Sequence, residues 1–487
     1  MEIPKEIKNI ISKLEKKGFK SCIVGGCVRD LLIGINPKDW DIATAAKPEE
    51  IKKVFPKSFY ENKFFTVTVK TGSKNPILKE VEITTYRLEA KYTDKRHPDE
   101  IKFAKTIEED LARRDFTVNA IALDFTGKKI ELIDPFSGQK NLKEEIIMAV
   151  GVPEQRFNED ALRMMRAIRL TVALSGNWKI EQKTAEAIKK SAYLLKMISK
   201  ERIRDELMKI IMSEKAAEGM ELLRQLGLLE HIIPEIEESY KVGQNKHHIY
   251  DCYEHALLSL KYAAKSKFNQ YVRFAALLHD IGKPRSKRGE GSDSTFYNHE
   301  IIGAKMANQI LNRLKFPKKD IEKIVKLVRY HLFYYNVDEV TESSVRRLVG
   351  QVGLENINEL LQVRMCDRIG SGVPKAEPYK LRHLRYIIEK VSQDPISVKS
   401  LKIKGDEVMK ILKIEPGPKV GQVLDILFGK VLENPESNKK ELLKKEVEKI
   451  KKLEDKEIKG LAEEARRERE KLETKRDEMT KKKYWVT

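Results

Sequence analysis

The alternation of hydrophobic and polar positions divides this chain into an α/β first part and a helical remainder. Between Phe19 and Asp134, short β-rich runs alternate with helical segments; the runs are SCIVGG, DWDIAT, FFTVTVK, EVEITTY and VNAIALDF. From Pro153 onward, Leu, Ile and Met recur at helical spacing, and strand signals stay scarce until past Ile396. The pattern predicts an α+β fold, with a small mixed-sheet head followed by an elongated, mostly α-helical body.

The helical remainder changes character along its length, which predicts separate domains. Histidines gather between His247 and His383, unlike in the helices before them. We therefore expect a head, connecting helices, a histidine-bearing helical domain, a body segment and a charged helical tail, at residues 1–150, 151–240, 241–390, 391–436 and 437–487.

The last two segments lead to different expectations. Residues 391–436 hold a Gly-Pro-rich turn and a basic amphipathic helix, which suits a nucleic-acid contact. Residues 437–487 are almost all Lys, Arg, Glu and Asp, with apolar residues at spacings near three and four: Leu443, Val447, Ile450, Ile458, Leu461 and Ala465. The pattern predicts a long solvated helix or partial coiled coil, and it favours a charged surface helix over a specific RNA arm.

Length and charge narrow the class of protein. A chain of 487 residues with 41% hydrophobic content exceeds what one core organises, so we expect about three or four domains. The formal net charge is +20, from 95 Lys and Arg against 75 Asp and Glu, which suits a polyanion such as nucleic acid. A lysine-rich surface that only keeps the protein dispersed explains this composition equally well, so the motifs must decide.

Cysteine usage and hydropathy favour a cytoplasmic protein without a membrane partner. The four cysteines form no C-x-x-C pair, so we expect buried thiols rather than a zinc knuckle or disulfides. The first 18 residues predict a charged amphipathic helix without the apolar region of a signal peptide, and no later stretch reaches the length of a membrane span. The oligomeric state stays open.

A predicted strand that runs into two glycines provides the first candidate site. Gly25 and Gly26 permit a close approach of the backbone to a ligand, and amide groups at the start of the following helix attract phosphate oxygens. Such a turn alone usually marks only a tight connection. Arg29 strengthens the phosphate-binding interpretation, because a fixed cation about one helical turn further on could reach a triphosphate.

Two carboxylates follow about ten residues later. Asp39 and Asp41 stand at i and i+2 in a predicted extended segment, so both project from one face. A divalent cation would relieve their repulsion, which suits the Mg²⁺-holding pair of a phosphoryl-transfer site. An isolated Asp-x-Asp turn would carry little weight. Glu82, between apolar neighbours on a predicted strand, could complete the cluster, although a solvent-facing strand residue explains it equally well.

A polar run and an arginine pair complete the head motifs. The run YRLEAKYTDKRHP at 86–98 predicts a mobile loop beside the site, and Arg113 and Arg114 precede a buried segment. The motifs GGCVRD, KDWDIAT, YRLEAKYTDKRHP and LARRDFTVNAIA together resemble, in type, order and spacing, the class II tRNA nucleotidyltransferases, relatives of the DNA polymerase β superfamily that include bacterial poly(A) polymerases. The resemblance implies a polymerase-β-like head that adds CMP, CMP and AMP from CTP and ATP to the 3′ end of tRNA.

Residues 159–169 predict a helix that could read the nucleotide base. Asp160 and Arg163 share a face in such a helix, and a structural ion pair is the simpler interpretation. Alternatively, Asp160 accepts a hydrogen bond from an exocyclic amine while Arg163 donates one to a ring nitrogen. Cytosine and adenine both present that edge, whereas uracil and guanine present a carbonyl and a ring N–H. One pair could therefore admit CTP and ATP without a template.

The family resemblance implies the same assignment for these residues. Similar enzymes use an EDxxR motif in this way, matched here by Glu159, Asp160 and Arg163. Three further arginines fall where the family contacts the nucleotide, although helix periodicity does not place all of them on one surface: Arg114, Arg166 and Arg169. The expected reaction is in-line attack of the tRNA 3′-hydroxyl on the α-phosphate with two metal ions.

Six residues of metal-ligand type recur in the histidine-bearing domain: His255, His279, Asp280, His299, His331 and Asp367. A single histidine on a helix is more often a core or surface residue, but an ordered series is harder to dismiss. The series, with the GKP that follows His279-Asp280, resembles the HD phosphohydrolase superfamily. It predicts one or two divalent transition ions, such as Ni²⁺, Co²⁺ or Mn²⁺, which would activate water for phosphoester hydrolysis. Such a site can also serve mainly to shape an RNA surface.

Several functions remain open at this point. The loop at 87–98 argues against an enzyme that adds only the two cytosines, but it does not separate full CCA addition from addition of A alone. Poly(A) polymerase is disfavoured because KIKGDEV and GPKVGQVLDILF resemble the tRNA-binding part of CCA-adding enzymes. An HD phosphohydrolase with a degenerate head and a non-catalytic RNA-binding protein are the alternatives of other classes. The intact Asp39 and Asp41 argue against a degenerate head, and two preserved metal sites argue against a purely binding role.

Overall fold

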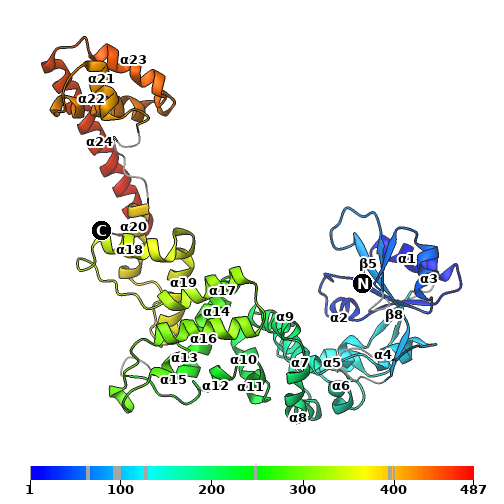
Figure 1. Cartoon of the computed structure of the whole chain (residues 1–487). Helices are drawn as coiled ribbons and strands as arrows, with labels where there is room; N and C mark the ends of the chain where they lie inside the picture. The colour runs from blue at the N-terminus through cyan, green and yellow to red at the C-terminus, as the bar shows by residue number, and fades with distance from the viewer. Residues whose placement is uncertain are drawn as a thin grey trace. The chain divides into compact units, whose positions relative to one another are not determined.

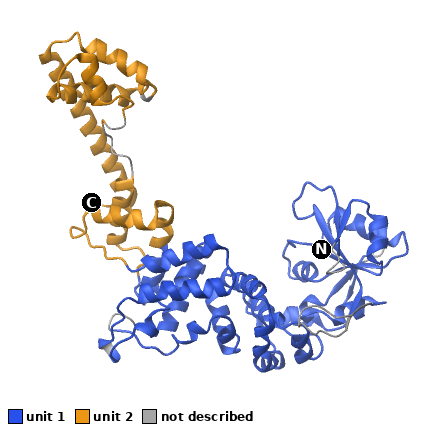
Figure 2. Cartoon of the chain, viewed as in Figure 1, with its two compact units in different colours: residues 1–332, 362–374 blue, residues 333–361, 375–487 orange. Residues whose placement is uncertain are grey.

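The chain folds into two compact units (Figure 2). In the computed structural model, the first unit comprises Met1–Leu332 and Gln362–Pro374, and the second comprises Phe333–Leu361 and Lys375–Thr487. The structure describes residues 2–61, 66–90, 100–125, 130–245, 249–392, 398 and 401–486. Within these ranges, no helix is both long enough and apolar enough to span a bilayer.

A seven-stranded mixed sheet forms the head (Figure 1). The strand order is β3-β4-β5-β2-β1-β8-β9, with β1 (Ser21–Val24), β2 (Asp41–Thr44), β3 (Ser58–Glu61), β4 (Thr66–Lys70), β5 (Glu80–Thr85), β8 (Ala122–Asp124) and β9 (Glu131–Ile133). β2 and β5 run parallel, whereas the other neighbours run antiparallel. The predicted mixed sheet is confirmed. Each predicted run contributes one strand, and β3 and β9 extend the sheet at its two edges.

Helices and a small second sheet complete the head: α1 (Lys5–Glu15), α2 (Gly26–Leu32), α3 (Pro48–Val54), α4 (Ile107–Ala112), η1 (Thr117–Asn119), α5 (Gly138–Glu144), β6 (Arg87–Ala90) and β7 (Glu100–Phe103). The amphipathic α1 buries four residues at helical spacing, Ile7, Ile10, Ile11 and Leu14. β6 pairs antiparallel with β7, so the polar run expected as a loop begins as a strand. Residues 91–98 of that run lie outside the described residues.

Short helices with a two-stranded sheet form the rest of the first unit: β10 (Ile146–Ile147), α6 (Pro153–Glu159), α7 (Leu162–Ala173), β11 (Lys179–Ile180), α8 (Gln182–Ser191), η2 (Ala192–Met197), α9 (Lys200–Ile211), α10 (Ala216–Gln225), α11 (Leu229–Ile232), α12 (Pro234–Glu237), α13 (Cys252–Lys265), α14 (Gln270–Leu278), α15 (Lys283–Ser286), η3 (Gly291–Asp293), α16 (His299–Arg313), α17 (Lys318–Tyr330) and the end of α19 (Leu354–Gly370). The buried Arg273 donates hydrogen bonds to the carbonyls of Ile211, Ser213 and Phe268, and so joins α14 to the ends of neighbouring helices.

The second unit is helical among its described residues: α18 (Glu342–Val352), the start of α19, α20 (Tyr379–Ser392), α21 (Gly405–Leu412), α22 (Pro418–Glu433), η5 (Pro435–Ser437), α23 (Lys440–Ile450) and α24 (Asp455–Tyr484). One hydrophobic core joins α21 and α22 to α23 and the first turns of α24. Ile458 of α24 is fully buried in this core beside Val423 and Leu427 of α22. Part of the charged tail therefore belongs to the hydrophobic core of this unit. Most of α22 also packs inside the unit. A nucleic-acid contact by residues 391–436 stays a prediction.

Candidate functional site

The turn between β1 and α2 brings the backbone close to an arginine. Gly25 has φ +82°, a left-handed conformation that favours glycine. A Cβ atom at Gly25 would lie 2.8 Å from Nη1 of Arg114 and 3.5 Å from Oδ2 of Asp41. The absence of a side chain at Gly25 therefore leaves the space in which Arg114 and Asp41 approach the start of α2.

Arg29 is held by two partners within the head. Its Nε and Nη2 donate to Oδ1 of Asp30 at 2.9 and 2.6 Å, and its Nη1 donates to Oδ1 of Asn119 at 2.8 Å. Asn119 in turn donates to Oδ1 of Asp115 at 3.1 Å. Arg29 is thus a fixed cation next to the glycine turn, as the sequence predicted, and its position depends on Asn119 and Asp115.

Three carboxylates gather at one end of the parallel strand pair. Asp41 is the first residue of β2 and stands in register opposite Glu82 on β5. Asp39 lies in the bend before β2, exposed, and the buried Trp40 separates it from Asp41. Burial raises the pKa of Asp41 to about 6; Arg114 opposes this rise, and the charges of Asp39 and Glu82 add to it. The cluster is therefore unfavourable without a cation, and its oxygen donors suit Mg²⁺.

Arg114 is oriented by a buried carboxylate that the sequence analysis missed. Asp110 in α4 has no exposed surface; its Oδ2 accepts from Nη2 of Arg114 at 3.3 Å, and its Oδ1 accepts from Nε of Arg113 at 3.0 Å. The same Oδ1 also accepts from the backbone N–H of Arg87 at 3.4 Å. Burial disfavours the charged carboxylate, yet the two arginines lower the pKa of Asp110 overall. Asp110 therefore fixes Arg114 relative to the first residue of β6.

The expected continuous helix at 159–169 is wrong. α6 ends at Glu159, Asp160 has extended backbone angles, and α7 begins at Leu162. Oδ1 of Asp160 accepts from the backbone N–H of Leu162 at 3.1 Å, so this side chain caps the new helix instead of continuing the old one. Asp160 and Arg163 consequently do not share the face of one helix.

The structural ion pair between Asp160 and Arg163, the simpler interpretation of this motif, is absent, and each of the two residues has other partners. Arg202 in α9 donates to both carboxylate oxygens of Asp160, at 3.2 and 2.7 Å. Arg163 donates to Oε2 of Glu159 at 2.8 Å and to the backbone carbonyl of Arg113 at 3.1 Å. Arg202 was missed because its partner lies far away in sequence and no motif marks it.

Arg166 and Arg169 are each paired with a buried acid. Arg166 donates from Nε and Nη2 to Oδ2 of Asp115, at 2.8 and 2.5 Å. Arg169 donates from Nε to Oε2 of Glu206 at 2.7 Å. Although Asp115 is buried, the charge of Arg166 lowers its pKa well below the usual range. These pairs connect α7 to the head and to α9. Of the two acids, Asp115 lies in the motif LARRDFTVNAIA, whereas Glu206 lies in no motif that was recognised in the sequence.

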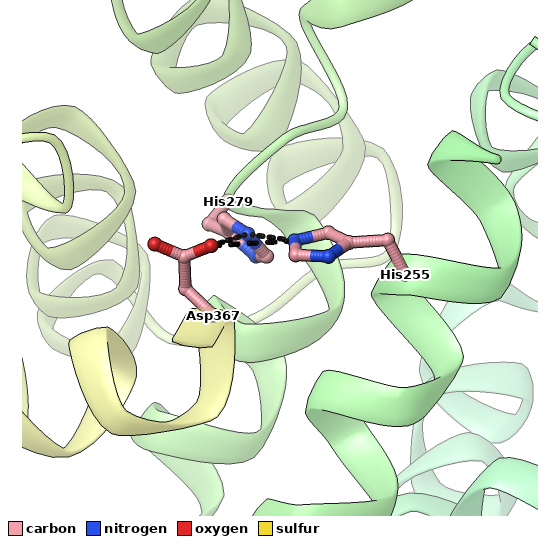
Figure 3. Close-up of side chains that lie close together, drawn as sticks. All are labelled: His255, His279 and Asp367. Carbon is pink, nitrogen blue, oxygen red and sulfur yellow. Dashed lines mark hydrogen bonds and ion pairs between the residues drawn. The ribbon is translucent and has the colours of Figure 1, made fainter. Parts of the chain in front are cut away.

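The six predicted metal-ligand residues of the second site come together in one buried cluster. Nε2 of His255 lies 2.9 Å from Nε2 of His279 and 3.5 Å from Oδ1 of Asp367 (Figure 3). Oδ1 of Asp280 lies 3.3 Å from Nε2 of His299 and 3.6 Å from Nε2 of His331. Two groups could each hold an ion: His255, His279 and Asp367, and Asp280, His299 and His331. Residues from α13, α16 and α19 and from the ends of α14 and α17 thus converge.

Backbone carbonyls orient three of the four imidazoles. Nδ1 of His279 lies 2.9 Å from the carbonyl oxygen of Ala276. Nδ1 of His299 lies 2.7 Å from that of Phe296, and Nδ1 of His331 lies 2.7 Å from that of Val328. A proton on Nδ1 that is donated to a carbonyl leaves Nε2 with its lone pair directed into the cluster. Burial disfavours a charged His279, but Asp280 and Asp367 raise its pKa to about 10. The donor set therefore attracts positive charge and suits a divalent transition ion.

A pocket of about 670 Å³ opens onto this cluster. Asp280, His299, His331 and Asp367 line it, and three cations share the wall: Lys283, Arg364 and Arg368. Nζ of Lys283 lies 2.6 Å from Oδ2 of Asp280, and Nη1 of Arg364 donates to Oδ2 of Asp367 at 2.6 Å. A pocket that combines cations with a metal-type cluster suits an anionic substrate such as a phosphoester.

Family models match three segments of the chain. They are described as Poly A polymerase head domain over residues 21–148, probable RNA and SrmB-binding site of polymerase A over residues 177–240, and HD domain over residues 248–370. Together with the mixed-sheet head, they define a nucleotidyltransferase of the polymerase-head class that carries an HD domain. More narrowly, the chain belongs to the family of the CCA-adding enzymes, which are tRNA nucleotidyltransferases. The resemblance found in the sequence is confirmed.

Individual relatives cover nearly the whole chain. The CCA-adding enzyme of Ligilactobacillus salivarius is 32% identical over 469 residues, covering 91% of this chain and 99% of the relative. The A-adding tRNA nucleotidyltransferase of Deinococcus radiodurans is 32% identical over 421 residues, covering 84% and 90%. The solved structure of the Bacillus stearothermophilus CCA-adding enzyme in complex with CTP is 28% identical with a TM-score of 0.59, covering 91% of this chain and 97% of the other.

Proposed function

We propose that the head adds CMP, CMP and AMP to the 3′ end of tRNA, using CTP and ATP. The observation that carries this proposal is the acidic cluster of Asp39, Asp41 and Glu82 beside the glycine turn and Arg114. The names of the relatives support the choice of reaction. A phosphoryl-transfer site needs acids that hold a cation and basic groups that receive a triphosphate, and the head holds both close together.

In the proposed mechanism, Asp39 and Asp41 would hold Mg²⁺, and Glu82 would support Asp41 from the neighbouring strand. Mg²⁺ would lower the pKa of the RNA 3′-hydroxyl and neutralise charge on the leaving pyrophosphate. The backbone at Gly25 and Gly26, with Arg29 and Arg114, receives the triphosphate. The 3′-oxygen attacks the α-phosphorus as the bond from the α-phosphorus to the bridging oxygen breaks, so pyrophosphate leaves without a covalent enzyme intermediate.

Base choice is assigned to Asp160 and Arg163 on neighbouring elements rather than on one helix. Asp160 has accepting capacity beyond the bonds from Arg202, because an ionised carboxylate offers about four lone-pair directions. It can therefore accept from the amine of cytosine or adenine, while Arg163 donates to the ring nitrogen. We assign Arg166 and Arg169 to the nucleotide site as well, where Asp115 and Glu206 would hold them in place.

The products on a tRNA transcript that ends at the discriminator base test the assignment. The transcript is incubated with magnesium and CTP, ATP or both, and the 3′ ends are sequenced. CCA ends with both nucleotides support the proposal. Long A-tracts would indicate a poly(A) polymerase. Extension only of a transcript that already ends in CC would indicate A addition, the activity named for the Deinococcus radiodurans relative.

A second activity is favoured by the HD cluster: we propose metal-dependent phosphoester hydrolysis with Ni²⁺, Co²⁺ or Mn²⁺. The convergence of all six predicted ligands on a pocket lined by cations supports it. The test compares phosphate release from a 2′,3′-cyclic nucleotide by the wild type and His279→Ala, in the presence of each ion. Hydrolysis should disappear in the variant while nucleotide addition remains. Equal hydrolysis by both proteins would refute this site.

A further inference from the structure

An exposed tryptophan stands beside a group of cations in the second unit, where the proposed reaction uses no residue. Trp485 follows α24 and is 79% exposed, whereas the two other tryptophans, Trp40 and Trp178, are 5% and 6% exposed. Single exposed apolar residues are common on protein surfaces, so exposure alone says little. The surroundings of Trp485 add two further observations.

First, the backbone at Trp485 is fixed while its ring is exposed. The N–H of Trp485 donates to the carbonyl of Lys482 at 3.2 Å, and the N–H of Val486 donates to the carbonyl of Lys481 at 3.0 Å. The carbonyl of Trp485 accepts from Nη1 of Arg382 at 3.4 Å, and Val486 is buried. Trp485 also holds a left-handed conformation with φ 55°, which is uncommon for a residue with a side chain. The indole is therefore presented on a fixed support.

Second, the end of α24 is joined to α20 through Glu389 and Tyr386. The hydroxyl of Tyr484 donates to Oε2 of Glu389 at 2.6 Å, as does Nζ of Lys483, also at 2.6 Å. The hydroxyl of Tyr386 donates to Oδ1 of Asp477 at 2.5 Å. These contacts hold the end of α24 against α20, and Arg382 of α20 reaches the backbone carbonyl of Trp485.

The charge balance of this surface is strongly positive. Residues 379–392 and 471–486 contain ten Lys and Arg against four Asp and Glu. Glu389 and Asp477 offset part of this charge through Lys483 and Lys481, while Lys482 is exposed three residues before Trp485. Exposed aromatic rings among lysines and arginines are the features that bind single-stranded nucleic acid, because bases stack on the ring while cations receive the phosphates.

We propose that Trp485 stacks on an unpaired base of the tRNA substrate, with cations of α20 and α24 holding the adjacent phosphates. The proposal takes tRNA as the partner from the proposed function. An anionic membrane fits this surface less well, because a helix that lies in a membrane needs a broad apolar face. On α24, the exposed Leu472 and Met479 are instead separated by Lys475 and Arg476.

Tryptophan fluorescence of the full chain tests this contact directly, because Trp485 is the one exposed tryptophan of three. A CCA-less tRNA transcript is titrated into the wild type and into Trp485→Phe. The difference in emission between the two proteins should change and saturate with tRNA. A blunt RNA duplex without unpaired bases should leave that difference unchanged. The RNA affinity of Trp485→Ala should fall about tenfold, because the variant loses the ring on which one base stacks.

Met479→Ala is the matched control, since Met479 is 65% exposed on the same helix. Its RNA affinity should equal that of the wild type. The proposal would be overturned if the emission difference between the wild type and Trp485→Phe did not change on addition of tRNA, or if Trp485→Ala bound RNA as tightly as the wild type. A change in that emission difference with anionic vesicles but not with tRNA would also overturn it. A protein whose Trp485 responds to tRNA but which adds no nucleotide would refute the proposed reaction and leave this contact standing.

Discussion

Arg202 holds Asp160 through hydrogen bonds to both carboxylate oxygens, at 3.2 and 2.7 Å. This pair joins α9 to the short connection between α6 and α7, which carries the residue proposed to accept the amine of the incoming base. Because Arg202 would act on the base only through Asp160, we assign it as a positioning residue. If Asp160 reads the base as proposed, base choice depends on a contact between α9 and the connection that precedes α7 as well as on the residues that face the base.

Arg202→Ala should weaken the choice of nucleotide more than the chemistry. Without its partner, Asp160 loses two charge-assisted hydrogen bonds, each worth roughly 1.5–3 kcal/mol, and its carboxylate can rotate. We expect the kcat/KM ratio of CTP over UTP to fall by about tenfold or more, as measured by single-nucleotide addition. Arg202→Lys should recover only part of it, because an amine cannot pair with both oxygens in the same geometry. An unchanged ratio in Arg202→Ala would contradict the positioning role.

Gly25→Ala should weaken nucleotide addition without unfolding the head. A methyl group at Gly25 would lie 2.8 Å from Nη1 of Arg114 and force that side chain to move. Gly34→Ala is the matched control, because Gly34 also has a positive φ, +76°, but no atom within 4 Å of the added Cβ. Both changes place a side chain at a positive φ and should lower stability by about 1–3 kcal/mol in a thermal unfolding scan. Only Gly25→Ala should lower kcat/KM, by tenfold or more; equal activities would contradict the close approach.

Divalent transition ions should stabilise the protein through the HD cluster. An ion that binds the folded state at 100 times its Kd adds about 2.7 kcal/mol to the free energy of unfolding. We expect Ni²⁺ or Co²⁺ to raise the melting temperature of the wild type and to leave that of His279→Ala unchanged. His231→Ala is the control, because His231 lies in α11, outside the cluster. A metal effect that persists equally in His279→Ala and His231→Ala would argue for nonspecific binding.

In the charged tail, Ile458 should contribute to the stability of the second unit, whereas Leu461 should contribute little. Ile458 is fully buried, so Ile458→Ala should lower the free energy of unfolding by about 2–5 kcal/mol. Leu461 is 41% exposed three residues later, and Leu461→Ala should cost less than about 1 kcal/mol. Denaturant unfolding monitored by circular dichroism separates the two. Equal small effects would mean that the tail is a solvated helix after all.

The head and the HD cluster could be predicted because local patterns determine them. Asp41 and Glu82 lie on strands whose alternation is visible in the sequence, and the HD residues follow a family order. The break at Asp160 could not be read from helical spacing, since an aspartate side chain that caps Leu162 competes with the helix only locally. Arg202 carried no signal, because its partner lies in another helix.

The tail shows a different limit of sequence patterns. Spacing near three and four correctly marked Ile458 as apolar on a helix, but the same spacing suits a coiled coil, a surface helix or a core helix. What decides among these is the partner surface on α22, which the sequence of the tail does not contain. The burial of tail residues was therefore beyond prediction.

The most direct test of the account is single-turnover nucleotide addition by Asp39→Ala and Asp41→Asn, measured with CTP on tRNA that lacks CCA and with ATP on tRNA that ends in CC. The two residues are assigned to the chemistry, and Asp160 and Arg163 to the choice of base. In both variants, the rates of CMP addition and of AMP addition should therefore fall alike, by roughly 1,000-fold, because each variant lacks a ligand of the metal ion. Loss of only one of the two additions, or full activity in both variants, would contradict the assignment of Asp39 and Asp41.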